Sequence, residues 1–149
     1  MDGTFNIRVY GLCVREGYIL LSDEVFQGIE MTKFPGGGLE YGEGTVACLY
    51  REFEEEHIGS VRSLSHYYTT DFFQAALFFE KTQLLSIYYL VDVEPRADYP
   101  VRNRAKFSPG SGGQQLRWVR LQELRAEDMT FPIDRKVVEL LQSDAALLP

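Results

Sequence analysis

The chain has 149 residues, enough for one compact domain with a buried core, and its apolar (45%) and charged (25%) fractions are ordinary for a globular protein. Its 22 acidic and 15 basic residues give a net charge of −7, which argues against binding to a nucleic-acid backbone. The sequence shows no apolar run of membrane-spanning length, no secretory signal and too few cysteines for a disulfide framework. We therefore expect one cytoplasmic domain over residues 1–149, with buried, reduced cysteines and neither a nucleic-acid nor a membrane partner.

The N-terminal part of the chain predicts a β-hairpin followed by a glycine-rich turn. Phe5–Val14 is extended in character, and Tyr18–Leu21 follows a turn signal at Glu16-Gly17, so we expect these two segments to pair. A further short extended piece, Met31–Phe34, runs directly into a proline and three glycines.

A helix and three strands are expected next. The helix should occupy roughly Thr45 to Ile58, with Val46, Leu49, Tyr50 and Phe53 on its buried side. Three segments rich in aromatic and β-branched residues then predict strands, over Val61–Thr69, Phe72–Phe79 and Leu84–Val93.

The last third of the chain predicts a long loop, a strand and a helix. The loop covers residues 94–113, which include three prolines and three glycines, and Gln115–Val119 forms the late strand. A C-terminal amphipathic helix begins near Pro132, because apolar residues recur at helical spacing at Ile133, Val137, Leu140 and Leu141. The whole layout indicates a mixed sheet with helices packed on it, in an α/β or α+β domain.

Three glutamates share one face of the first predicted helix. Glu52, Glu55 and Glu56 stand at positions i, i+3 and i+4. Carboxylates in this arrangement repel one another by about 0.2–0.5 kcal/mol per exposed pair. A divalent cation would remove this repulsion, and hard carboxylate oxygens suit Mg²⁺ or Mn²⁺. A solvated acidic face is the alternative interpretation.

Two neighbouring features favour the metal site over a plain acidic surface. Arg51 directly precedes the glutamates and is placed to steady a neighbouring carboxylate. The triple glycine at residues 36–38 provides bare backbone that can approach a ligand closely, although glycines alone would indicate only a turn.

The spacing of these residues resembles the signature of the Nudix (MutT-like) hydrolases. That signature is a glycine, five residues, a glutamate, seven residues, and then Arg-Glu-aliphatic-any-Glu-Glu-any-Gly-aliphatic. Here Gly37, Glu43 and Arg51 keep this spacing, and Glu52, Glu55 and Glu56, hereafter the box glutamates, follow in place. On this resemblance the chain is identified as a member of the Nudix family, whose fold is an α/β/α sandwich with a mixed central sheet.

The sequence departs from the signature at two positions. Phe53 occupies an aliphatic slot, and Ile58 stands where a glycine is expected, with Gly59 one residue later. We expect the helix to run one residue longer and Gly59 to end it in the left-handed conformation. His57 would then lie in the last helical turn and complement the helix dipole rather than act as a base.

The resemblance implies that the box glutamates, with the backbone carbonyl of Gly37, bind one or more Mg²⁺ ions, for which Mn²⁺ can substitute. The metal would neutralise a diphosphate and orient an attacking water. Arg51 would hold a box glutamate in place, Glu43 would tie the loop to the helix, and Gly38 would support the loop.

The general base is left open between two kinds of residue. Glu52 or Glu55 would assist as the base, with Arg51 completing the catalytic group. Some relatives use a glutamate from the loop before the late strand, but Ser108–Arg117 contains no acid. The other acids considered for this role are Glu80, Asp92 and Glu94.

The implied substrate is a small molecule of the nucleotide type: a nucleoside triphosphate, or a nucleoside diphosphate derivative such as ADP-ribose or a sugar nucleotide. Phe72 is a candidate for stacking on the base, Asp134 for recognising it, and Arg102 and Arg104 for gripping a terminal phosphate. Phe72 also has a structural explanation as a core aromatic, and Arg102 and Arg104 have one as solvated loop charges. The alternatives to hydrolysis are a nucleotide-binding sensor and a diphosphate isomerase of the same fold, and a homodimer is compatible with the family.

Overall fold

The computed structural model describes residues 2–108 and 113–148. The chain forms two compact units, each built from separate stretches of sequence. The first unit contains the residues up to Gly11 together with Gly36–Arg96, and the second contains Leu12–Pro35 together with the chain from Ala97 onward. The glycine-rich turn and the box glutamates therefore both belong to the first unit.

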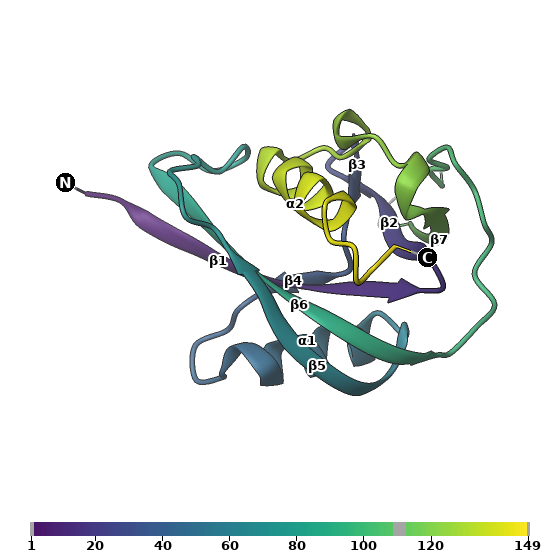
Figure 1. The fold of residues 1–149 in the computed structure, drawn as a ribbon. Coiled ribbons are helices and arrows are strands. Elements are labelled where there is room, and N and C mark those ends of the chain that lie inside the picture. The colour runs from purple at the N-terminus through teal and green to yellow at the C-terminus, as the bar shows by residue number, and fades with distance from the viewer. Residues whose placement is uncertain (1, 109–112, 149) are drawn as a thin grey trace. The chain divides into compact units, whose positions relative to one another are not determined.

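The first unit consists of a sheet and one helix. Its elements are β1 (Thr4–Arg15, whose last residues belong to the second unit), β4 (Gly36–Gly38), α1 (Thr45–Glu55), β5 (Gly59–Thr69) and β6 (Thr82–Pro95). The strands β5 and β6 form a long antiparallel ladder, drawn in teal in Figure 1, and β1 pairs antiparallel with β4. Helix α1 packs against β4 and β5. The strands predicted over Phe5–Val14, Val61–Thr69 and Leu84–Val93 are confirmed as β1, β5 and β6, each with longer bounds.

The buried side of α1 is formed by Cys48, Leu49 and Phe53. Phe53 packs so closely on β1 that a Cβ at Gly11 would overlap its ring, which explains why a glycine stands there. The prediction of the buried side was wrong for two residues, since Val46 is 40% exposed and Tyr50 is 45% exposed. The buried apolar stripe of α1 includes Cys48 in place of Val46 and Tyr50.

The end of α1 differs from the prediction. The helix ends at Glu55, three residues early, and the left-handed residue is His57 (φ 54°). The Ile58 N–H donates to the Phe53 carbonyl (3.0 Å) and the His57 N–H to the Glu54 carbonyl (3.1 Å), which is the Schellman pattern. His57 therefore lies beyond the helix and not in its last turn.

Gly59 has a different role from the predicted helix stop. It is the first residue of β5, has a φ of 152°, and a Cβ there would overlap the carbonyl oxygen of Glu94 on the paired strand. A glycine is therefore required by the close approach of β5 and β6 rather than by the end of the helix.

The predicted strand over Phe72–Phe79 was wrong. Residues 70–81 form a loop that carries only an isolated bridge between Ala75 and Gln83. The segment is rich in aromatic residues but lacks the alternation that would give it one buried face, and Phe73 is 72% exposed. Composition alone therefore misplaced this element.

The second unit is built around β2. Its other elements are β3 (Ile29–Lys33), β7 (Gln114–Arg120), the short 3₁₀ helices η1 (Leu121–Glu123) and η2 (Ala126–Asp128), and α2 (Pro132–Gln142). Strand β2 (Tyr18–Phe26) pairs antiparallel with β3, with β7 and with the end of β1, so the predicted hairpin and the late strand are confirmed. The C-terminal helix is also confirmed, although Val138 and not Leu140 completes its buried side.

An ion pair is buried inside the second unit. The Arg117 side chain on β7 is 2% exposed and the Asp23 side chain on β2 is 0% exposed, and Arg117 Nε donates to Asp23 Oδ2 at 2.7 Å. Asp23 also accepts from the Thr32 hydroxyl (2.8 Å) and from the backbone N–H of Lys106 (3.1 Å). Arg117 Nη1 donates to the Arg102 carbonyl (3.0 Å), so the pair fixes the loop before β7 at two points.

The fold has few helices and a mixed sheet, which confirms the predicted α+β class. Cys13 and Cys48 are both buried thiols, as expected. None of the helices in the described part of the chain is long and apolar enough to cross a membrane.

Candidate active site

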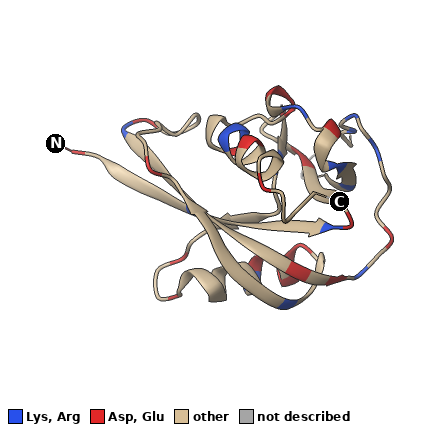
Figure 2. Ribbon diagram, in the orientation of Figure 1, with Lys and Arg blue, Asp and Glu red and all other residues tan. Residues whose placement is uncertain are grey.

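The loop between β4 and α1 is closed by Glu43. Its Oε1 accepts a hydrogen bond from the backbone N–H of Glu40 (2.9 Å), and its own N–H donates to the Glu40 carbonyl (3.3 Å). The helix begins two residues later, at Thr45. Acidic positions on this loop and on α1 give the region the negative charge visible in Figure 2.

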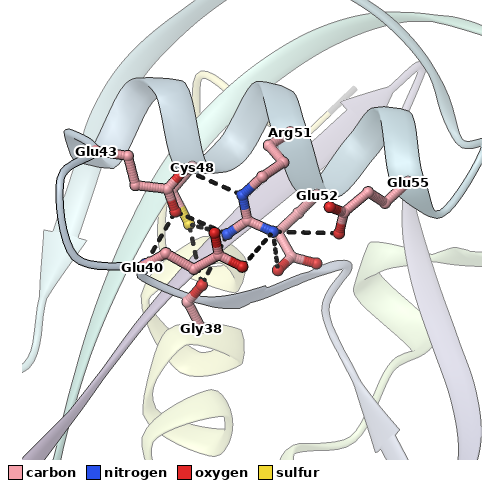
Figure 3. Close-up of polar contacts among 7 residues, drawn as sticks. All are labelled: Gly38, Glu40, Glu43, Cys48, Arg51, Glu52 and Glu55. Carbon is pink, nitrogen blue, oxygen red and sulfur yellow. Dashed lines mark hydrogen bonds and ion pairs between the residues drawn. The ribbon is translucent and has the colours of Figure 1, made fainter.

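Arg51 lies at the centre of the site (Figure 3). Its Nε and Nη2 donate to the two carboxylate oxygens of Glu43 at 3.0 and 2.7 Å, a bidentate pairing of the strong, charge-assisted kind. Nη2 also donates to the carbonyl of Gly38 at 3.0 Å. One guanidinium therefore joins the helix, the loop and the glycine strand.

The remaining nitrogen of Arg51 contacts two of the box glutamates. Nη1 donates to Glu52 Oε1 and to Glu55 Oε2, both at 3.1 Å, and lies 3.6 Å from Glu40 Oε1. Surrounded by these carboxylates, with the hydrogen bond to Glu43 as the largest cause, the guanidinium has a pKa raised above its ordinary value and stays charged.

Glu52 lies directly against the glycine strand. Its side chain is only 15% exposed, compared with 58% for Glu55, and a Cβ at Gly37 would overlap its carboxylate. Glu56 follows as the half-buried C-cap residue of α1. A carboxylate held against bare backbone offers hard oxygen donors, which fits a divalent cation.

The box glutamates do not form a finished metal cage. Among residues 2–108 and 113–148, no three acidic, histidine or cysteine side chains converge closely enough to hold an ion together. Arg51 bonds Glu52 and Glu55 instead. Each of these bonds uses one carboxylate oxygen, Oε1 of Glu52 and Oε2 of Glu55.

Two titratable groups of the network have shifted pKa values. Hydrogen bonds from Arg51 and from the Glu40 backbone lower the pKa of Glu43 to about 2. Burial, with the hydrogen bond to Glu43 next, raises the pKa of Cys48 to about 12. The Cys48 thiol, which donates to the Gly38 carbonyl (3.5 Å), therefore stays protonated and is not a nucleophile.

We expect Glu43 to make stability depend on pH. Its pKa is lowered from 4.5 to about 2, so its contribution is complete above pH 4.5 and is lost as the pH falls through about 2. Urea unfolding at steps of pH should show this loss as a fall in the free energy of unfolding of the wild type. Glu43→Gln should be less stable at neutral pH, and its free energy of unfolding should lack this part of the slope against pH. Glu54→Gln, on the exposed face of α1, should keep the wild-type slope. An unchanged slope in Glu43→Gln would contradict the assignment.

The other acidic residues considered as the general base, besides the box glutamates, lie on or next to β6. Glu80 is exposed in the turn before the strand, Asp92 is exposed opposite Ser63, and Glu94 forms an ion pair with Arg62 on β5. The choice of general base among these and the box glutamates stays a prediction.

The candidate substrate residues are divided between the two units. Phe72 lies in the first unit, in the loop over residues 70–81, and is 39% exposed. In the second unit, the backbone of Arg102 bonds Trp118 and Arg117, Arg104 is exposed, and Asp134 is buried in the first turn of α2. Their roles toward a substrate stay predictions.

Three parts of this arrangement were not foreseen from the sequence. Glu40 and Cys48 join the Arg51 network, and Asp23 pairs with Arg117 in the second unit. Glu40 stands in the glycine-rich lead-in, and charged residues inside otherwise apolar strands were a signal for the ion pair. The sequence holds no comparable signal for Cys48.

The fold and the site together define an α+β protein whose glycine strand is joined by one arginine to a glutamate-bearing helix. Comparison with known proteins agrees with this class. The family model described as the NUDIX domain matches residues 5–141. A comparison with curated protein sequences gave no match. The chain belongs to the NUDIX family, as its motif predicted, and this membership supports a hydrolase.

Several solved structures are similar to this chain. A NUDIX hydrolase from Nitrosomonas europaea is 19% identical with a TM-score of 0.68, and the match covers 96% of this chain and 90% of that one. A MutT NUDIX hydrolase from Burkholderia pseudomallei is 18% identical with a TM-score of 0.67, covering 91% and 97%. An ADP compounds hydrolase is 15% identical with a TM-score of 0.64, covering 96% and 74%. At these identities the likeness shows the fold alone, and it confirms the predicted Nudix-type fold.

Proposed function

We propose that this protein is a metal-dependent Nudix pyrophosphohydrolase. It cleaves the diphosphate linkage of a nucleoside triphosphate or of a nucleoside diphosphate derivative such as ADP-ribose or a sugar nucleotide. The observation that carries the proposal is the position of Glu52, held by Arg51 with its carboxylate against the bare backbone of Gly37. Family membership supports the reaction class, and one structure of the same fold is described as an ADP compounds hydrolase.

The proposed metal ligands are the box glutamates and the backbone carbonyl of Gly37, with Mg²⁺ as the ion and Mn²⁺ as a substitute. The bound metal supplies neutralisation of the diphosphate and a water of lowered pKa. Glu52 and Glu55 would hold the ion through their carboxylate oxygens, and the bidentate bond to Glu43 would keep the guanidinium of Arg51 in place beside them.

The general base in this proposal is Glu52 or Glu55, which accepts the proton of the attacking water. In the first unit, Phe72 is the candidate for stacking on a base. In the second unit, Asp134 is the candidate for recognising a base, and Arg102 and Arg104 are the candidates for binding a terminal phosphate. The sequence support for each of these substrate contacts is weaker than for the metal ligands, since none belongs to the signature.

The proposal includes the protein's setting. A net charge of −7 supports a small nucleotide-type substrate rather than a nucleic acid. The family match over residues 5–141 supports a single Nudix domain over residues 1–149. Two buried thiols support a cytoplasmic location.

A panel of substrates with Mg²⁺ tests the proposed function. Phosphate and pyrophosphate release would be followed with nucleoside triphosphates, ADP-ribose, sugar nucleotides and dinucleoside polyphosphates. We expect wild-type protein to cleave at least one class, and Glu55→Gln and Glu56→Gln to cleave it much more slowly. Wild-type protein that cleaves nothing would reject the enzyme, and variants as fast as wild type would reject the assigned residues.

The second candidate function is a nucleotide-binding sensor without hydrolysis. The observation that favours it is that Arg51 bonds both Glu52 and Glu55, so that part of their charge is neutralised within the protein. Binding of a nucleotide from the panel without its cleavage, at saturating Mg²⁺, would establish this function instead.

A further inference from the structure

The loop between β5 and β6 exposes a row of apolar side chains. Every second residue of its apolar stretch is exposed, and the residues between them are half-buried. The exposed residues, hereafter the apolar row, are Phe73, Ala75, Leu77 and Phe79. Phe73 is 72% exposed, Leu77 is 53% exposed and Phe79 is 56% exposed. Apolar side chains gathered on a surface in this way mark a place where another molecule binds.

The start of β1 adds a further exposed aromatic residue beside this loop. The Thr4 N–H donates to the Lys81 carbonyl at 3.0 Å, and the hydroxyls of Thr4 and Thr82 are hydrogen-bonded at 3.1 Å. The next residue of β1, Phe5, is 67% exposed. In Figure 1 the loop lies at the end of the teal β5–β6 pair, beside the N-terminal part of β1.

The exposed area matches the apolar part of a protein–protein interface. A phenylalanine offers about 150–250 Å², so at these exposed fractions Phe5, Phe73 and Phe79 together present roughly 300–500 Å². A standard interface takes about 800 Å² from each partner, and somewhat more than half of that area is apolar. Two such surfaces placed face to face therefore supply the apolar core of a standard interface.

The loop also presents an edge that can pair with an identical edge. The Ala76 N–H donates to the Thr82 carbonyl and the Leu84 N–H donates to the Gln74 carbonyl, both at 2.8 Å. In an antiparallel pair these bonds place the backbone groups of Ala75 on the outer edge. An exposed apolar edge is a template for pairing with another chain, and two identical edges match when they run antiparallel around a two-fold axis.

The distribution of charge allows two copies of the chain to meet at this loop. Each copy carries a net charge of −7, so two copies repel one another over most of their surfaces. Residues 72–79 contain no Asp, Glu, Lys or Arg, although a quarter of the whole chain is charged. Contact through this segment therefore brings no like charges directly together.

We propose that the apolar row is the interface of a homodimer, in which it packs on the same row of a second copy of this chain around a two-fold axis. Ala75 lies at the centre, because its small side chain and outward backbone groups permit close approach, and Phe73, Leu77 and Phe79 form the apolar core. The inference is independent of the proposed function, since none of the proposed metal ligands belongs to the row.

Sedimentation equilibrium of the full chain tests this interface. Wild-type protein should pass from 17.1 kDa toward twice this mass over a roughly hundredfold range of concentration. Phe73→Glu and Leu77→Glu should each raise the dissociation constant of the dimer by at least about 30-fold, because each places like charges at a desolvated two-fold contact. The matched control is Tyr41→Glu, which changes a fully exposed aromatic residue outside the row and should leave the constant unchanged.

Hydrogen exchange of the wild type gives a readout that does not depend on the folding of any variant. Amides of residues 73–79 should exchange more slowly above the dissociation constant than below it, whereas amides of the loop over residues 39–44 should not change. A wild type that is monomeric throughout, or a dimer that both acidic variants leave intact, overturns the inference. Equal exchange of residues 73–79 at both concentrations overturns it as well. A monomer that sediments with phosphatidylcholine vesicles would assign the row to a membrane surface instead and overturn the homodimer.

Discussion

Replacing Glu52 by glutamine should reduce kcat/KM by more than about 100-fold. Mutation of residues that only hydrogen-bond to a metal ligand typically lowers metal affinity or activity about 10- to 100-fold, and Glu52 is proposed to be a ligand itself. The amide keeps the size of the side chain and its place against Gly37, so the change removes charge and leaves packing almost intact. The same variant should bind Mg²⁺ or Mn²⁺ more weakly, which calorimetry with the metal alone would measure.

The matched control for Glu52→Gln is Glu54→Gln. Glu54 lies on the same helix, its side chain is 72% exposed, and it only pairs loosely with Arg96 at 3.4 Å. This variant should keep wild-type activity and metal affinity, because its face of the helix points away from the glycine strand. If the two variants lost activity equally, the loss would come from the charge of the helix as a whole, and the assignment of Glu52 would be wrong.

Asp23→Ala should destabilise the protein by about 3–5 kcal/mol, the cost of leaving one partner of a buried ion pair without the other. Arg117 would keep its charge at a position where its side chain is 2% exposed, and the hydroxyl of Thr32 and the N–H of Lys106 would lose their acceptor. Since domains of this size have total stabilities of about 5–15 kcal/mol, the loss should be evident in urea unfolding and in the melting temperature.

The control for Asp23→Ala is Asp128→Ala. Asp128 pairs with Arg125 at 3.5 Å, but the two side chains are 33% and 68% exposed, so its loss should cost less than about 1 kcal/mol. Replacing both charges, as Asp23→Leu with Arg117→Met, should recover part of the stability, because no unpaired charge is then buried. Equal effects of Asp23→Ala and Asp128→Ala would show that the buried pair is not specially important.

The sequence predicted those parts of the fold that depend on local patterns. The β1–β2 hairpin follows from the turn at Glu16-Gly17, and α2 follows from apolar spacing after Pro132. The Phe72–Phe79 strand was wrong because aromatic composition does not specify whether a partner strand and a buried face exist. The end of α1 was wrong because the glycine was taken as the helix stop, whereas Gly59 serves the approach of β5 to Glu94.

For the candidate site, the sequence placed the box glutamates and Arg51 on one helix, since that depends on spacing within one element. It gave no means of finding Glu40, which lies near Arg51 only because the loop before α1 folds back toward the helix. The same limit applies to Asp23 and Arg117, which only the pairing of β2 with β7 brings together. Contacts between elements could therefore not be predicted from the single sequence, whereas spacing within one element could.

The contacts of Arg51 also have a consequence for the local unfolding of the first unit. Because one side chain bonds Glu43 in the loop, Gly38 in β4 and Glu52 in α1, the opening of any one of these segments breaks a bond to Arg51. Amide hydrogens of the loop and of the middle of α1 should therefore exchange together, as one cooperative unit. Slower exchange of these amides together in wild type than in Arg51→Gln would show that this one side chain couples the three segments.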